Sequence, residues 1–398
     1  MANQMSSSCF LIHLLLLLLL LQLLLPSTEA AAAYDITSFG AKPDGHSDST
    51  RPFLDAWSAA CRSSGPATVH VPAGTFLIGP TTFPGPCKSS SIIVQIDGTL
   101  VAAPSSHASE DWLLFHHVAG VSVYGGTIDG RGASLWSCKA NGHNCPRGAT
   151  SLRFLGSKNI VISGLTSINS ELYHIVIDDS QGVTVQGVKI SAPGNSPNTD
   201  GVHVQMSTDV TVTGTGIKTG DDCISIGPGT TNLWIERVTC GPGHGISIGS
   251  LGKEDQEQGV QNVTVKSTVF TGTENGLRIK TWGRPSDGFV RGVVFEHALM
   301  QNVQNPIIID QNYCPDGNSC PNQQSSSGVK ISQVSYNDIQ GSSASQVAVK
   351  FDCSSSNPCS GIGLQDVKLT YGNSAAEATC EHADGSASSA VEPPSCLL

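Results

Sequence analysis

Side chains that could do chemistry recur in four short motifs of this sequence: "NTDGVHV" (198–204), "GDDCISI" (220–226), "GHGISIG" (243–249) and "NGLRIKTW" (275–282). The motifs supply three carboxylates, an imidazole, a guanidinium and an ammonium group, at Asp200, Asp221, Asp222, His244, Arg278 and Lys280. Clustered carboxylates repel one another, and this repulsion raises the pKa of at least one of them. Hydrolysis of a glycosidic bond needs one protonated and one ionised carboxyl group. The motifs therefore predict a hydrolytic site.

A spacing of 22 residues relates the first three motifs, because it carries Asp200 to Asp222 and then to His244. The same spacing repeats an apolar position at Val202, Ile224 and Ile246. If one coil of the chain has this length, the apolar residues form an inward stack of one sheet. The three polar side chains then stack outside it, about 4.8 Å apart per coil. In the fourth motif, the arginine and the lysine would also point outward.

Each motif has a plainer interpretation. Gly-Asp pairs are ordinary turn residues, a single histidine is more often a satisfied polar residue, and an Arg-Ile-Lys strand is usually a solvated face. The three aspartates could also bind Ca²⁺, which prefers carboxylate ligands. The common register of the motifs favours a catalytic site over these alternatives.

Strand-like units recur beyond residue 90, as in "GVSVYGGTIDG" at 120, "NIVISGLTSIN" at 159 and "GVTVQGVKISA" at 182. Each has a β-branched segment with period-2 alternation and then a turn rich in Gly, Asn and Asp, with no helical segment between units. We therefore predict an all-β fold, a parallel β-helix, over residues 34–398 as one domain. The segment "DSTRPFLDAWSAAC" (48–61) predicts an N-terminal capping helix with Phe53, Leu54, Trp57 and Cys61 on its apolar face.

The chain begins with a predicted secretory signal peptide, residues 1–30, with cleavage between residues 30 and 33. Its removal takes Cys9 of the 13 cysteines and leaves an even number, which in a secreted chain indicates disulfides. Sequence alone leaves the connectivity open, and close spacing suggests the pairs Cys61–Cys87, Cys138–Cys145, Cys223–Cys240, Cys314–Cys320, Cys353–Cys359 and Cys380–Cys396. "NVT" at Asn262 is an N-glycosylation acceptor.

The four motifs and their flanks, from "FGAKPDGHSDST" to "NPIIIDQNYCP", resemble the signature motifs of the polygalacturonases, the pectin hydrolases of glycoside hydrolase family 28. The residues of these segments are similar to those of the plant members of the family. The resemblance implies a right-handed parallel β-helix that hydrolyses α-1,4-galacturonosyl linkages with inversion and needs no metal or other cofactor. Inversion requires carboxyl groups roughly 6.5–9.5 Å apart, with room for water.

The resemblance also implies a role for each residue that matches the motifs. Asp221 would be the general acid, Asp200 and Asp222 would activate water, and His244 would hold the protonation state of the acid. Substrate binding would fall on Arg278, Lys280, Tyr313 and Asn198, and Asn198 would act mainly by shaping the turn of the first motif.

A formal net charge of −11 argues against nucleic acid or anionic membranes as partners. We expect a secreted, monomeric enzyme of the plant cell wall that acts on pectin. Two rival functions are a pectate lyase, which eliminates with calcium and an arginine base, and a wall-binding β-helix without activity. The ordered Asp and His motifs favour the hydrolase, while endo or exo action stays open.

Overall fold

The structure is a computed structural model that describes residue 12 and residues 32–104, 109–142, 144–315, 320, 326–372, 374–388 and 390–397. The predicted signal peptide, apart from Ile12, lies outside the described residues and stays a prediction. Within the described ranges, no helix has the length and apolar character needed to cross a membrane.

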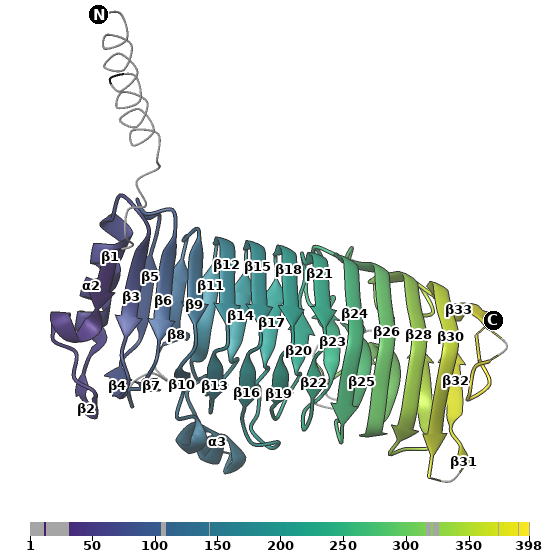
Figure 1. Cartoon of the computed structure of the whole chain (residues 1–398). Helices are drawn as coiled ribbons and strands as arrows, with labels where there is room; N and C mark the ends of the chain where they lie inside the picture. Colours follow the sequence, from purple (N-terminus) through teal and green to yellow (C-terminus); the bar gives the residue numbers. More distant parts are fainter. Residues whose placement is uncertain are drawn as a thin grey trace, which may run out of the picture.

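The described chain winds through stacked coils, whose strands form two long sheets with almost entirely parallel pairing (Figure 1). One sheet carries the four motifs, and its strands are β5 (Thr81–Pro84), β8 (Asp111–His116), β11 (Thr150–Leu155), β14 (Ile175–Asp178), β17 (Val202–Gln205), β20 (Ile224–Ile226), β23 (Ile246–Leu251), β25 (Asn275–Trp282), β27 (Asn305–Tyr313), β29 (Val347–Asp352) and β32 (Glu377–Glu381). We call it the motif sheet.

The second sheet has two rows of strands in its early coils. One row contains β1 (Ala32–Asp35), β3 (Ala67–Val71), β6 (Ile92–Ile96), β9 (Val121–Tyr124), β12 (Lys158–Ser163), β15 (Gln181–Gln186), β18 (Thr208–Thr213) and β21 (Thr231–Glu236). The other contains β2 (Asp44–Asp48), β4 (Thr75–Ile78), β7 (Thr99–Ala102), β10 (Thr127–Asp129), β13 (Thr166–Ile168), β16 (Lys189–Ser191), β19 (Gly216–Lys218) and β22 (Thr239–Cys240).

The two rows merge at one long strand, β24 (Val260–Thr271), which pairs with both β21 and β22. The later strands of this sheet are β26 (Phe289–Val303), β28 (Lys330–Ser343), β30 (Cys359–Tyr371) and β33 (Ala383–Ala387), with a short antiparallel strand, β31 (Ser374–Ala375). The coil geometry therefore changes just after the third motif.

The expected apolar stack is confirmed in the motif sheet. Val202 pairs with Ile224, Ile224 with Ile246, and Ile246 with Leu277, and none of the four is exposed. These residues are part of one continuous core that extends along the whole stack. Because alternate residues of a strand face opposite sides, the residue after each of them faces away from this core.

A helix covers the N-terminal end of the stack, as predicted (Figure 1). This helix, α2 (Thr50–Arg62), follows a short 3-10 helix, η1 (Ile36–Phe39), and Asp48 Oδ1 accepts the Thr50 N–H at 2.9 Å. Its fully buried face consists of Phe53, Ala56, Trp57 and Ala60, whereas the predicted Leu54 and Cys61 are only partly buried.

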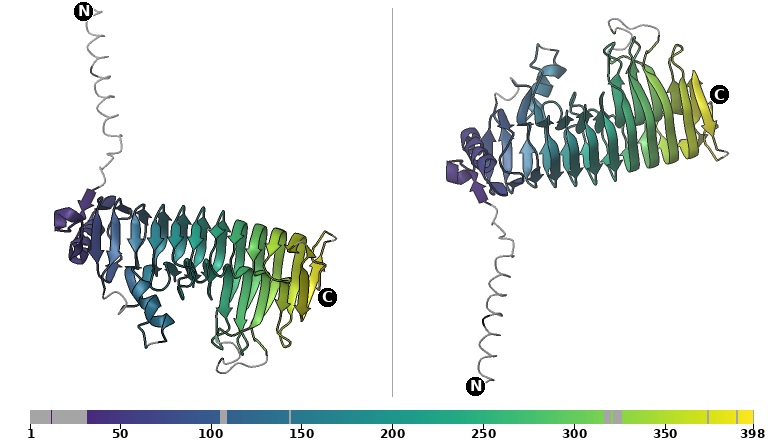
Figure 2. Two further views of the ribbon diagram at one scale, coloured as in Figure 1. Left: turned by 90° about the horizontal axis from the view of Figure 1, so that it is seen from below. Right: turned by 90° about the horizontal axis from the view of Figure 1, so that it is seen from above.

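The six proposed disulfides are all present, and the predicted fold, a disulfide-stapled parallel β-helix, is confirmed. A second helix, α3 (Ala133–Ala140), is an element that the repeat pattern did not predict. It projects from the same side of the stack as the ends of the long later strands (Figure 2). The coils that bear the first three motifs lie between these two projections.

Candidate active site

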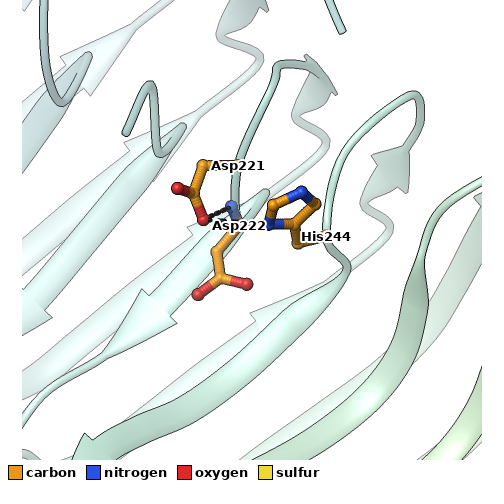
Figure 3. A group of neighbouring side chains, drawn as sticks. All are labelled: Asp221, Asp222 and His244. Carbon is orange, nitrogen blue, oxygen red and sulfur yellow. Dashed lines mark hydrogen bonds and ion pairs between the residues drawn. The ribbon is translucent and has the colours of Figure 1, made fainter. Parts of the chain in front are cut away.

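The paired aspartates lie in a tight turn directly before β20. Gly220 is required there, since an added Cβ would come within 2.1 Å of the Ser196 carbonyl oxygen. The disulfide from Cys223 to Cys240 fixes the far side of the turn. The Asp222 N–H donates to Asp221 Oδ1 at 2.8 Å, and the carboxyl group of Asp222 turns away from that of Asp221 (Figure 3). The turn therefore presents two neighbouring carboxyl groups to different surroundings.

Asp222 is fully buried and accepts hydrogen bonds on both of its oxygens. Lys280 Nζ lies 2.7 Å from Oδ2, Arg278 Nη2 lies 2.8 Å from Oδ1, and Ser247 Oγ also donates to Oδ1 at 2.7 Å. Burial alone would raise the pKa of Asp222, but the charges of Lys280 and Arg278 and these hydrogen bonds lower it to about 2. Asp222 is therefore a carboxylate across the working range of pH.

The two cations come from the outward positions of β25, as expected. Arg278 pairs in register with Ser247, and its Nε donates to Ser247 Oγ at 2.9 Å. Both cations are largely buried, with 9% and 8% of the side chains of Arg278 and Lys280 exposed. The ring of Tyr313 lies beside them, 5.2 Å from Lys280 Nζ and 6.0 Å from Arg278 Cζ. The three predicted substrate-binding residues thus form one cluster, whose charge is balanced in part by Asp222.

Asp200 lies one coil before Asp222, and the Gly201 N–H donates to the Asp222 carbonyl oxygen at 2.9 Å. Asp200 is buried, with 6% of the residue exposed. Burial, followed by the charges of Asp221 and Asp222, raises the pKa of Asp200 well above its ordinary value, although a hydrogen bond with Ser225 and the charge of Lys280 oppose the rise. Two buried carboxyl groups in adjacent coils therefore have pKa values shifted in opposite directions.

Asp221 contacts a histidine from the next coil and an asparagine from the previous one. His244 Nδ1 lies 3.2 Å from Asp221 Oδ1, and His244 Nε2 lies 3.4 Å from Glu274 Oε2. Asn198 has a left-handed backbone, with φ of 58°, and its Nδ2 donates to Asp221 Oδ2 at 3.5 Å. Asn198 thus both shapes its turn and contacts the aspartate.

The pKa of His244 reflects these contacts. Burial lowers it, but the hydrogen bond and charge of Asp221 and the charge of Glu274 outweigh that effect, so the net shift is upward. His244 therefore holds a proton more readily than a free histidine does, and it holds that proton beside Asp221.

The expected simple stack of Asp200, Asp222 and His244 is wrong in one respect. The main chains follow the 22-residue register, but His244 hydrogen-bonds Asp221, while Asp222 points to Ser247 and the cations. The turn before each strand, and not the strand's alternation, sets these directions. One oxygen each of Asp221 and Asp222 and one nitrogen of His244 lie within 4.8 Å of one another.

These same three side chains are the group among the described residues that could hold a metal ion. Their atoms are close enough for shared coordination. However, Arg278 and Lys280 already contact both oxygens of Asp222, so a divalent cation would have to displace or approach two positive charges. The arrangement suits an anionic ligand or proton transfer better than cation binding.

Five further residues surround the site without having been predicted: Tyr173, His203, Ser225, Ser247 and Glu274. His203, Ser225, Ser247 and Arg278 pair successively on neighbouring strands, and His203 Nδ1 lies 2.7 Å from Ser225 Oγ. The register of the apolar stack could have revealed these outward neighbours. Tyr173 stacks on the His203 ring at 5.1 Å, a contact with no sequence signal.

Comparison with known proteins gives a consistent result. Residues 61–390 match the sequence profile of Glycosyl hydrolases family 28. The chain is 60% identical to a polygalacturonase of Prunus persica over 92% of this chain and 93% of that protein. It is 43% identical to an exopolygalacturonase of Platanus acerifolia over 88% and 93% of the two chains. The solved structure of a polygalacturonase from Erwinia carotovora matches with a TM-score of 0.67 and 26% identity, over 89% and 98% of the two chains.

Proposed function

This chain belongs to glycosyl hydrolases family 28 and hydrolyses polygalacturonate, and we infer that it cleaves the α-1,4-galacturonosyl linkages of pectin by acid–base catalysis with inversion. One observation carries the mechanism. The buried carboxyl groups of Asp200 and Asp222 have pKa values shifted in opposite directions, beside a third, more accessible carboxyl group at Asp221. Carboxyl groups whose pKa values differ in this way can carry out different steps of one reaction.

Asp221 donates the proton to the departing glycosidic oxygen. Its side chain is 20% exposed, whereas that of Asp222 is 1% exposed, so Asp221 is the more accessible of the pair to a polymer. His244 is a positioning residue that hydrogen-bonds Asp221 and holds the orientation of its carboxyl group. Transfer of this proton from Asp221 lets the leaving group depart as a neutral sugar hydroxyl, which is the purpose of general acid catalysis.

Asp200 and Asp222 together activate water. A carboxylate with a raised pKa is the stronger base, so Asp200, once ionised, takes the proton from water. Asp222 stays ionised because Lys280 and Arg278 hold its negative charge, and it orients the same water. Because Asp200 has the raised pKa and Asp222 is neutralised in part by two cations, we assign the proton-accepting role to Asp200.

Arg278, Lys280 and Tyr313 bind the substrate next to the cleaved bond. Asp222 only partly neutralises the two cations. A galacturonate carboxylate that approaches this cluster would therefore accept hydrogen bonds from Arg278 and Lys280. The flat ring of Tyr313, already beside both cations, supplies apolar contact to a sugar face.

The proposed setting is extracellular. The predicted signal peptide, and relatives that are named plant polygalacturonases, support a secreted enzyme of the plant cell wall. We also propose that residues 34–398 form one catalytic domain that acts as a monomer on pectin, without nucleic-acid or membrane partners.

A product assay tests the function. Incubation with polygalacturonate in the presence of EDTA should release reducing ends without ultraviolet-absorbing unsaturated ends, and early NMR spectra should show the anomer inverted from the α-linkage. Unsaturated ends would indicate elimination by a lyase, and no release of ends would indicate a binding protein. Retention of configuration would overturn the inverting mechanism while leaving hydrolysis in place.

A further inference from the structure

A groove beside the active site is lined in part by the segment that carries α3. Its cavity has a volume of about 540 Å³, and its lining includes Lys139, Arg147, Tyr173 and Asn198. None of these residues except Asn198 belongs to the four motifs. The lining thus contains two cations and two residues that contact the active site.

The groove is continuous with the catalytic carboxylates. Asn198 lines it and also donates to Asp221 Oδ2, and the Tyr173 ring lies on the His203 ring. Burial raises the pKa of Tyr173, and the charges of Asp200 and Asp221 raise it further. A polymer bound at Asp221 can therefore continue into this groove without leaving the surface.

The two cations retain hydrogen-bonding capacity. Lys139 Nζ donates to the Arg147 carbonyl oxygen at 3.1 Å, which uses one of the three donors of an ammonium group. The Arg147 side chain is 73% exposed, and its ion pair with Glu110, which is 78% exposed, has a long separation of 3.9 Å. Such an exposed pair is weak, so a carboxylate ligand can replace Glu110.

A disulfide fixes the segment that bears these cations. Cys138, at the end of α3, is joined to Cys145, two residues before Arg147. Behind the segment, the buried Glu171 accepts the Ala149 N–H at 3.1 Å. The side chains of Lys139 and Arg147 thus project from a tethered frame, and this limits the ordering entropy that binding would cost.

We propose that Lys139 and Arg147 bind galacturonate carboxylates of the polymer on the side of the cleaved bond opposite Arg278 and Lys280. This proposal rests on the proposed function and deepens it. The α3 segment belongs to the coil of β11, and β25 lies five strand steps further along the motif sheet, which is roughly 24 Å at about 4.8 Å per step. One chain of several sugar units, with a carboxylate on each, therefore meets a cationic cluster on both sides of Asp221.

Steady-state kinetics of the double variant Lys139→Ala/Arg147→Ala test the assignment at low ionic strength. We expect KM for polygalacturonate to rise about 10-fold or more with kcat little changed, because each lost charge-assisted contact weakens binding without touching the reacting atoms. The increase should shrink in high salt, and Arg147→Lys should retain most of the affinity. The matched control is Arg291→Ala/Lys368→Ala, which removes the same charge from the other sheet and should leave KM unchanged.

Direct binding separates this proposal from the proposed function. An oligogalacturonate of defined length is titrated into the Asp221→Asn protein with and without the double substitution, so that the result does not depend on turnover. Weaker binding in the double variant supports the subsite, and equal binding overturns it. If the unmodified chain releases no reducing ends from polygalacturonate, the proposed function fails whatever the titration shows.

Discussion

Several described histidines lie between two carboxylates, and two of them invite comparison: His70 near the N-terminal end and His244 in the coils of the candidate active site. His70 contacts Asp35 at 2.8 Å and Asp97 at 2.9 Å. His244 contacts Asp221 at 3.2 Å and Glu274 at 3.4 Å. The pKa of each histidine is raised, against the effect of burial, by its carboxylate partners. The N-terminal cluster has the shorter contacts, yet the catalytic proposal concerns the other one.

The difference lies in what surrounds each cluster. The side chains of His70, Asp35 and Asp97 are between 32% and 50% exposed, so water screens their charges. Around His244, the buried Asp200 and Asp222 interact with Asp221 in a less polar setting, and Arg278 and Lys280 are buried with them. A histidine between carboxylates is therefore no signature of catalysis by itself. In the proposed mechanism, the acid and the base differ because Asp200, Asp222, Arg278 and Lys280 are buried beside Asp221.

The largest effect is expected for Asp222→Asn, which removes the common partner of Arg278 and Lys280. Both cations stay buried without a countercharge, which costs roughly 3–5 kcal/mol of the free energy of unfolding. Turnover should fall by about 10²–10⁴-fold or more, since water loses its orienting carboxylate. Urea unfolding and kcat on polygalacturonate measure the two losses.

The matched control for Asp222→Asn is Asp338→Asn, which breaks the exposed contact of Asp338 with His297. It should change neither the urea midpoint nor kcat appreciably. An Asp222→Asn protein with an unchanged midpoint would show that the buried ion pairs do not hold the site together.

Asp221→Asn should lower turnover by about 10²–10⁴-fold with little loss of stability, because the amide cannot protonate the leaving oxygen. A galacturonide with an activated leaving group departs without that proton. It should therefore recover part of its rate with Asp221→Asn but not with Asp200→Asn. Recovery in the reverse order would mean that the acid and the base are exchanged.

Asp200→Asn should lose activity and yet gain stability. The folded-state pKa of Asp200 is raised, so its ionisation costs folding free energy as pH rises above its ordinary pKa of about 3.9. The neutral amide removes this cost, and the melting temperature at pH 7 should exceed that of the unmodified protein. The gain should vanish below about pH 3.9, where the carboxyl group is protonated in both states. A lower melting temperature at pH 7 would contradict the raised pKa.

The smallest effect is expected for His70→Gln. Because the folded-state pKa of His70 is raised, its stabilising charge is fully present below about pH 6.5 and is lost as pH rises through the folded-state value. The variant should melt slightly lower than the unmodified protein at about pH 5.5 and equally at alkaline pH. Exposed pairs contribute little, so a large drop, or a drop only at alkaline pH, would contradict this reading.

The repeat pattern was sufficient to predict the β-helix, the stack of Val202, Ile224 and Ile246, and all six disulfides, because these depend on local period and short spacing. It could not predict that Lys280 meets Asp222, 58 residues away, since the insertion "LGKEDQEQG" breaks the constant register between those coils. The contact of Glu274 with His244 was missed for the same reason. The α3 segment follows no repeat at all, so its groove became visible only in the structure.

The paired variants His244→Gln and His70→Gln test the central claim most directly, when kcat/KM on polygalacturonate and the melting temperature are measured on the same preparations. Burial beside Asp200 and Asp222 predicts a loss of at least about 10-fold in kcat/KM, with an altered pH profile, for His244→Gln alone. His70→Gln should keep full activity and show only its pH-dependent shift in melting temperature. Equal activity of the two variants, or loss of activity in His70→Gln alone, would contradict the account.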